Sequence, residues 1–353
     1  MSKKLYLVVT VFLSYFHVFY AQWNHIPVFP DLQDVELKDS LLEKYALVNA
    51  LSDQRDTLFA KVDGISGKLT CIYTDYTITL NPNADPTQDA FSKGINTEHC
   101  YPKSKGAGDN SGEFNMHHLF PAKEDVNNYR ASKPFHDIPD NLTQHWYYLT
   151  NDMSTIPTQN IDLYSEGNSE AFEPSEAQKG NIARAMMYFY TFYTNQANAQ
   201  DPNFFWDQLD ELCTWHFEDP VDEDEWNRTF AIAKYQEDKP NPFVLDCSVA
   251  ARLYCNEISQ ECKILDTKNG LTTDDNIKIN YLIENSELRI TNNTGNSYSF
   301  AIYNSIGNLL SSVNVPVSQS YFSYDLSSMK GNQMFYVILQ LDGMIYSKAF
   351  LKL

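Results

Sequence analysis

Apolar residues recur along this chain with two different periods. In residues 37–60, and again in 176–195, 204–216, 226–235 and 247–254, they return every three or four positions, which predicts amphipathic helices. Residues 69–80 are rich in Thr, Tyr and Ile and predict a strand. From residue 280 onward, short runs rich in Ile, Val, Tyr and Phe alternate with Asn, Gly and Ser turns, which is typical of an immunoglobulin-like antiparallel β-sandwich. The pattern therefore predicts an α+β chain: a mostly helical domain followed by a small all-β module.

The length of 353 residues suits a main domain with a sizeable core and one smaller module. Residues 1–21 carry two lysines and then an apolar run that ends at Ala21, which is the pattern of a secretory signal peptide. We expect the main domain over 22–262, a polar linker over 263–279 and the β-sandwich over 280–353. The expected mature protein is a secreted or cell-surface monomer without a transmembrane segment.

The cysteines fit an exported protein, because disulfides persist in oxidising compartments. Their spacings lack the paired C-x-x-C motif of a structural zinc site, so we expect disulfides or free thiols. Sequence alone does not choose among the pairings. The six cysteines are Cys71, Cys100, Cys213, Cys247, Cys255 and Cys262. The last three are close together in sequence, so disulfides among them could cross-link the end of the main domain.

The net charge of −20 argues against tight, non-specific binding of nucleic acid, since Lys and Arg supply the affinity for phosphate. The acidic residues are concentrated elsewhere, however. Residues 201–226 contain ten acidic residues and no Lys or Arg, whereas residues 93–133 contain six basic and five acidic residues. A polyanionic substrate is therefore compatible with the stretch 95–135, where the candidate chemistry gathers.

Glu98 and His99 are neighbours in a segment that is expected to be extended, so their side chains point to opposite faces. Asn127 lies on a helix that we expect to begin at Pro121. A carboxylate oxygen and a carboxamide oxygen form a hard ligand set that suits Mg²⁺ or Ca²⁺ with several retained waters, and not structural zinc. A neutral His99 can take a proton from an attacking water. The residues predict phosphodiester hydrolysis with one metal ion.

Four blocks of the chain resemble, in order, the bacterial endonuclease I family of secreted nucleases, which contain a ββα-metal (His-Me) finger. The blocks are TEHCYPKS, NMHHLFPAKEDVNNYRASKPF, FEPSEAQKGNIARAMMYFYTFY and LCTWHFEDPVDEDEWNRTFAIAKYQEDKPNPFV, within residues 41–254. The resemblance implies cleavage of DNA, and also of RNA in some members, with little sequence specificity and with 5′-phosphate products. It implies that His99 is the general base and that Glu98 and Asn127 hold one ion, Mg²⁺ with Ca²⁺ or Mn²⁺ as alternatives.

Further roles follow from the same resemblance. Glu113 stands where some members carry a carboxylate that assists proton transfer, and Arg130 occupies the N-x-x-R position, where it is expected to contact phosphate. The family's arginine before the Glu-His pair is replaced by Thr97. A second family arginine, which lies near the scissile phosphate, is also missing, and only Lys103 and Lys105 are available to take its place.

The remaining polar residues of the stretch are expected in supporting roles. His117 and His118 are expected to orient the finger through hydrogen bonds, and Asn128 to lie on the helix surface or contact a phosphate. The alternative for Glu113 and Arg130 is a structural salt bridge, and for the two lysines simple solvation.

The C-terminal segments FAIYNSIGNLL and YDLSSMKGNQMFYVILQLDGMIYSKAFLKL resemble the sorting domain of the type IX secretion system of Gram-negative bacteria. The resemblance implies that the secretion machinery is a partner of this module. The alternative is an ordinary immunoglobulin-like binding module. For the whole chain, the alternatives to a nuclease are a non-catalytic surface adhesin with a degenerate nuclease domain and a phosphodiesterase of small substrates.

Overall fold

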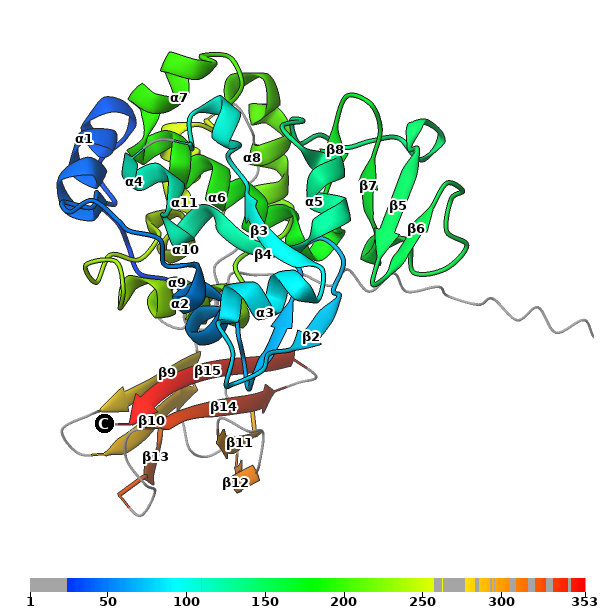
Figure 1. Cartoon of the computed structure of the whole chain (residues 1–353). Coiled ribbons are helices and arrows are strands. Elements are labelled where there is room, and N and C mark those ends of the chain that lie inside the picture. Colours follow the sequence, from blue (N-terminus) through cyan, green and yellow to red (C-terminus); the bar gives the residue numbers. More distant parts are fainter. Residues whose placement is uncertain are drawn as a thin grey trace, which may run out of the picture. The chain divides into compact units, whose positions relative to one another are not determined.

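The computed structural model describes residues 24–108, 110–256, 262, 277–282, 286–292, 294, 296–304, 309–316, 321–327, 333–341 and 344–352 (Figure 1). The chain divides into two compact units, residues 1–263 and 264–353. The expected signal peptide, residues 1–21, lies outside the described residues, as does most of the expected linker. In the described ranges, no helix is both long and apolar enough to cross a bilayer.

The first unit is built around α6 (Lys179–Phe192), in which twelve residues are buried. A Cβ on Gly180 would lie 1.9 Å from the carbonyl oxygen of Asp219, so glycine permits the close approach of α6 to the end of α8. The other helices are α1 (Asp34–Tyr45), α2 (Arg55–Thr57), α3 (Pro86–Ser92), α4 (Asn110–Glu113), α5 (Glu124–Arg130), α7 (Thr194–Gln200), α8 (Leu209–Glu218), α9 (Glu223–Ala233), α10 (Pro242–Leu245) and α11 (Ser248–Leu253). A π-helical turn, η1 (Leu58–Val62), follows α2, and 3-10 turns occur at η2 (Lys103–Lys105), η3 (Met116–His118), η4 (Asp140–Leu142), η5 (Ile161–Leu163), η6 (Glu176–Gln178) and η7 (Trp206–Gln208).

Short strands flank these helices. A four-stranded sheet has the order β6-β5-β7-β8, with β5 (His145–Tyr148), β6 (Asn151–Met153), β7 (Ser165–Gly167) and β8 (Phe172–Glu173). The single strand expected over residues 69–80 was wrong: the segment forms a hairpin of β1 (Lys68–Thr70) and β2 (Thr77–Thr79). The chain reverses at Asp75, which has φ 55°, a left-handed conformation that aspartate tolerates in turns.

The stretch 95–135 contains a ββα unit. Strand β3 (Ile95–His99) pairs antiparallel with β4 (Leu119–Lys123), and α5 follows β4 directly (Figure 1). The helix expected from Pro121 therefore starts three residues later than predicted. Ala122 is fully buried in β4, and the carbonyl of Pro121 accepts a hydrogen bond from the amide of Ile72, so tertiary packing keeps this segment extended. The predicted finger fold is confirmed.

The second unit is the predicted β-sandwich. One sheet has the order β13-β10-β9 and the other β12-β11-β14-β15. Alternate residues are buried along the strands, among them Leu288 and Ile290 in one sheet and Phe335, Val337 and Leu339 in the other. The strands are β9 (Ile277–Leu282), β10 (Glu287–Asn292), β11 (Tyr298–Asn304), β12 (Leu309–Val315), β13 (Tyr321–Asp325), β14 (Gln333–Leu341) and β15 (Met344–Lys352).

Two disulfides close the end of the first unit, Cys213–Cys255 and Cys247–Cys262. Cys71 and Cys100 are buried free thiols. The expectation of disulfides is thereby confirmed.

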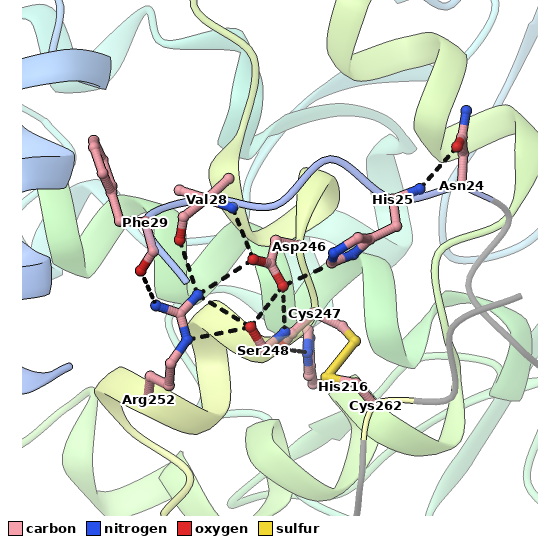
Figure 2. Close-up of polar contacts among 10 residues, drawn as sticks. All are labelled: Asn24, His25, Val28, Phe29, His216, Asp246, Cys247, Ser248, Arg252 and Cys262. Carbon is pink, nitrogen blue, oxygen red and sulfur yellow. Dashed lines mark hydrogen bonds and ion pairs between the residues drawn. A yellow bond between two sulfur atoms is a disulfide. The ribbon is translucent and has the colours of Figure 1, made fainter. Parts of the chain in front are cut away.

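A polar network joins the N-terminal segment to the same end of the unit (Figure 2). Asp246 accepts a hydrogen bond from the amide of Val28 at 2.9 Å, and Arg252 donates to the carbonyl of Phe29 at 2.7 Å. Residues more than two hundred positions apart are thus held together around one buried carboxylate.

Candidate active site

Glu98 points to the buried face of β3. Its Oε1 accepts hydrogen bonds from the hydroxyl of Tyr73 at 2.8 Å and from Nη1 of Arg130 at 2.9 Å. Burial raises the pKa of Glu98, and the positive charge of Arg130 opposes that rise. The other oxygen, Oε2, has no hydrogen-bond partner among the residues that the structure describes. The carboxylate is therefore fixed through one oxygen, and the second remains available to a ligand.

Arg130 is fully buried beneath this carboxylate. Besides Glu98, its guanidinium donates to the carbonyls of His99 at 3.1 Å and Cys100 at 2.8 Å, and it lies 4.3 Å above the ring centre of Phe135. The expected contact between Arg130 and phosphate is wrong for this geometry, because the donors face the interior. Arg130 instead positions Glu98 and holds the end of β3, which corresponds to the structural salt bridge kept as its alternative.

Asn127 lies one helical turn before Arg130 on α5. Its Nδ2 donates to Oδ1 of Asn96 at 2.6 Å and to the carbonyl of Thr97 at 3.2 Å. Both contacts use the NH₂ group, so they fix which way the carboxamide points. No described residue donates to Oδ1 of Asn127, so the carboxamide oxygen is open while the amide nitrogen contacts the residue that precedes Glu98.

His99 extends from the opposite face of β3, as the alternation of a strand requires. Its Nε2 lies 3.1 Å from the carbonyl of Glu113. A carbonyl only accepts, so Nε2 carries the proton in the neutral ring and Nδ1 does not. Burial, together with the positive charges of Lys103 and Arg55, lowers the pKa of His99 to about 4, although hydrogen bonds to the backbone of Glu113 and Thr97 oppose the shift. The imidazole is therefore neutral at pH 7.

The donor set has the chemistry of a hard cation site. In the described part of the chain, no group of three or more His, Cys, Asp or Glu residues could hold a metal ion. Glu98 and Asn127 instead offer two oxygens from neighbouring elements, which fits an ion such as Mg²⁺ that keeps most of its waters.

Comparison with known proteins identifies the family of the chain. The model of the Endonuclease I family matches residues 42–247, more than half of the chain. The chain belongs to the endonuclease I family. It is therefore a nuclease that acts on nucleic acid, and the family is generally metal-dependent.

Two further comparisons add little about function. No curated protein matches the chain. A solved immunoglobulin-like β-sandwich protein of the DUF3244 family from Bacteroides vulgatus is 13% identical, with a TM-score of 0.21, over 24% of this chain and 92% of its own.

In this endonuclease I family member, the loop between β3 and β4 is fixed by polar contacts. His118 donates through Nε2 to the carbonyl of Gly112 at 2.6 Å, next to the carbonyl of Glu113 that anchors His99. The side chain of Asn115 donates to the hydroxyls of Tyr188 and Tyr193 at 3.0 and 2.9 Å. These contacts place the Glu113 carbonyl where it can hold His99 in one tautomer.

His117 is buried and donates through Nε2 to the carbonyl of Lys239 at 2.9 Å. Burial lowers the pKa values of His117 and His118 to about 3, so both are neutral at pH 7. Both rings support the fold of the loop and neither reaches Glu98 or Asn127 through a hydrogen bond.

The acidic and basic residues of the loop form ion pairs. The Glu113 carboxylate accepts from Lys103 at 2.6 Å, so the side chain of Glu113 faces the lysine and only its backbone carbonyl contacts His99. Lys105 pairs with Asp201 at 2.7 Å. Asn128 is exposed on α5. Of the two lysines, Lys103 is the one that lies at the site.

A pocket with a volume of about 540 Å³ lies against His99. Its lining comes from α2, α3, β3 and η2 and consists of Arg55, Thr87, Gln88, Phe91, Ile95, Asn96, Thr97, His99 and Lys103. Sequence reasoning missed Arg55, Tyr73 and Asn115. Arg55 and Tyr73 belong to no recognisable local motif, and Tyr73 contacts Glu98 across 25 positions of the chain. Asn115 opens the block NMHHLFPAKEDVNNYRASKPF, but its partners Tyr188 and Tyr193 lie more than seventy positions away.

Proposed function

We propose that this endonuclease I family member is an exported, metal-dependent endonuclease that hydrolyses phosphodiester bonds of DNA, and of RNA as a second substrate, with little sequence specificity. The observation that carries the proposal is the arrangement around β3. An oxygen of Glu98 and the carboxamide oxygen of Asn127 are left open, and the neutral His99 extends from the opposite face.

Glu98 through Oε2 and Asn127 through Oδ1 are the residues that would hold one Mg²⁺, with Mn²⁺ or Ca²⁺ as alternatives. When bound, such an ion supplies positive charge to a phosphate oxygen and to the leaving oxygen as the bond breaks. Tyr73 and Arg130 keep the carboxylate oriented for this role through its other oxygen.

His99 is the general base in this proposal. Its Nδ1 takes a proton from water while the water oxygen forms a bond to phosphorus, and the bond between phosphorus and O3′ breaks. The products are a 5′-phosphate and a 3′-hydroxyl, whose proton comes from solvent. The carbonyl of Glu113 keeps the ring in the tautomer that leaves Nδ1 unprotonated.

The second unit is proposed to act in export. The resemblance of its C-terminal segments to type IX sorting domains, together with its sandwich fold, supports a role as the address read by that secretion machinery. The protein is proposed to reach the cell surface or the medium as a monomer, after removal of residues 1–21.

The direct test of the nuclease proposal is nicking of supercoiled plasmid by the purified chain with Mg²⁺, with and without EDTA. His99→Ala should abolish nicking, because the neighbouring ring of His118, 5.7 Å from that of His99, is fully buried and hydrogen-bonded to the carbonyl of Gly112. His136→Ala is the control, since His136 pairs with Glu211 at 3.3 Å, outside the ββα unit. Equal nicking by the wild type and His99→Ala would overturn the role of His99. No nicking by the wild type would overturn the nuclease proposal and favour a non-catalytic adhesin.

A further inference from the structure

The pocket beside His99 contains groups that the proposed cleavage step does not use. Arg55, Phe91 and Lys103 line it together with His99. Its volume of about 540 Å³ is within the range of small-molecule sites. Any group that fills the pocket therefore lies against the proposed general base.

Hydrogen bonds hold the two walls of the pocket together. Oδ1 of Asp56 accepts from the amide of Thr87 at 3.1 Å and from its hydroxyl at 2.6 Å, which joins α2 to the start of α3. Asp85 caps α3 by accepting from the amide of Gln88 at 2.8 Å. These contacts hold α2 and α3 together, so that Arg55 on α2 and Phe91 on α3 line the same pocket.

The basic side of this pocket suits a phosphate group. Arg55 donates through Nε and Nη2 to Asp53, and Nη1 has no hydrogen-bond partner among the described residues. The side chains of Arg55 and Lys103 are 43% and 52% exposed, so both are accessible to a ligand. A guanidinium with an open donor is well suited to a phosphate oxygen.

Another part of the lining suits a nucleobase. Phe91 is a large aromatic residue of this lining, and it is 56% exposed. An exposed aromatic ring binds bases by stacking, and it accepts every base because each has a π-face. The amide groups of Gln88 and Asn96 line the same space.

We propose that this pocket binds the nucleotide next to the scissile phosphate, with Arg55 contacting a phosphate oxygen and Phe91 stacking on the base. The proposal rests on the nuclease function proposed above. A base that stacks on Phe91 has left its neighbours in the strand, so the preferred substrate is single-stranded or locally unpaired nucleic acid. Stacking on Phe91 accepts every base, so it is compatible with the proposed cleavage with little sequence specificity.

The test measures binding separately from cleavage. Anisotropy of a short, fluorescein-labelled single strand is recorded in EDTA for the wild type, Arg55→Ala, Arg55→Lys, Phe91→Ala and Phe91→Trp. Arg55→Ala should weaken binding about 10-fold and reduce the slope of log K against log salt by about 1, as expected for one phosphate contact. The affinity of Arg55→Lys should lie between those of the wild type and Arg55→Ala, since lysine keeps the positive charge and loses the bidentate geometry of the guanidinium.

Phe91→Ala should weaken binding of the single strand about 5-fold to 100-fold, and Phe91→Trp should restore it. The preference for single strand over duplex should shrink in Phe91→Ala. The control is Arg289→Ala, since Arg289 also pairs with a carboxylate two positions earlier, Glu287 at 3.5 Å, in the other unit. Its binding should equal that of the wild type.

Plasmid nicking, measured in parallel, separates the two proposals. If the wild type nicks DNA and both Arg55→Ala and Phe91→Ala bind like Arg289→Ala, the nucleotide pocket is wrong and the nuclease function stands. If the wild type neither binds nor nicks, both proposals fail. Unchanged circular dichroism spectra of the variants exclude misfolding as the cause of a loss.

Discussion

The first unit contains two fully buried arginines, each paired with a glutamate, and the two pairs differ in what they leave open. Arg184 donates a hydrogen bond to Oε1 of Glu225 at 2.8 Å, forms an ion-pair contact with Oε2 at 2.6 Å, and also donates to the carbonyl of Asp219. Arg130 meets only Oε1 of Glu98. The first pair ties helices α6 and α9 together, whereas the second presents a carboxylate oxygen. We propose that this difference separates a pair that stabilises the fold from a pair that serves the active site.

An isosteric substitution of the glutamate in each pair should reveal the difference in role between the two pairs most clearly. Glu98→Gln should reduce the nicking rate about 10³-fold, because the charge that would hold the metal ion is lost and several kcal/mol of transition-state stabilisation go with it. Initial rates of plasmid nicking at saturating Mg²⁺ measure the effect. A rate close to that of the wild type would mean that Glu98 is only structural.

Glu225→Gln should do the reverse. The free energy of unfolding should fall by about 3–5 kcal/mol, because Arg184 is left as an uncompensated buried charge. All five tryptophans lie in the first unit, so their fluorescence during urea unfolding reports this unit alone. The nicking rate per folded molecule should be unchanged. A large drop in that rate would mean that the Glu225–Arg184 pair also contributes to activity and is not only structural.

A smaller effect is expected from Tyr73→Phe, which removes one donor to Glu98 and keeps the ring. Loss of a group that orients a metal ligand typically costs about 10-fold to 100-fold in activity. Titration of the rate with Mg²⁺ should show a weaker apparent affinity. The matched control is Tyr254→Phe, which removes a hydroxyl near Thr191 in the core, and its Mg²⁺ dependence should equal that of the wild type.

The smallest expected effect is on the pH dependence of the free energy of unfolding, through His216 beside the Arg184–Glu225 pair. Burial lowers the pKa of His216 to about 3, and the charge of Arg184 adds to that shift. Below pH 6.5 the unfolded chain binds a proton at this residue and the folded chain does not, so acid destabilises the fold. His216→Gln removes that titration. The free energy of unfolding should depend on pH less steeply between pH 6 and 4, by about 1.4 kcal/mol per pH unit.

A pH dependence as steep as that of the wild type would contradict the assignment of a neutral, buried His216. The measurement compares urea unfolding of both chains by tryptophan fluorescence at each pH.

The sequence predicts the parts of this molecule that depend on local pattern. Alternation over residues 280–353 predicts the sandwich, and the spacing of Glu98 and His99 in a strand predicts that they face opposite ways. The frequent occurrence of proline in the first turn of a helix predicts a helix at Pro121, whereas burial of the neighbouring Ala122 keeps Pro121 in β4. At this position tertiary packing outweighs the local conformational preference.

The roles of Arg130 and Arg55 depended on contacts across the chain. The N-x-x-R spacing places Arg130 one turn from Asn127, but only the fold shows that its guanidinium is turned inward onto Glu98. Arg55 lies in a separate helix before the motif, and the packing of α2 on α3 brings it to the pocket. Sequence spacing carries no information about such long-range contacts.

In the proposed mechanism, Glu98 and Asn127 hold one metal ion and His99 takes a proton from water. Binding of Mn²⁺, a spectroscopic substitute for Mg²⁺, can be measured by electron paramagnetic resonance in the wild type, His99→Ala, Glu98→Gln and Asn127→Leu. We expect one tightly bound ion in the wild type and in His99→Ala, although the latter should not nick DNA, and weaker binding in the other two variants. Equal Mn²⁺ binding by the wild type and by Glu98→Gln would show that Glu98 does not hold the ion.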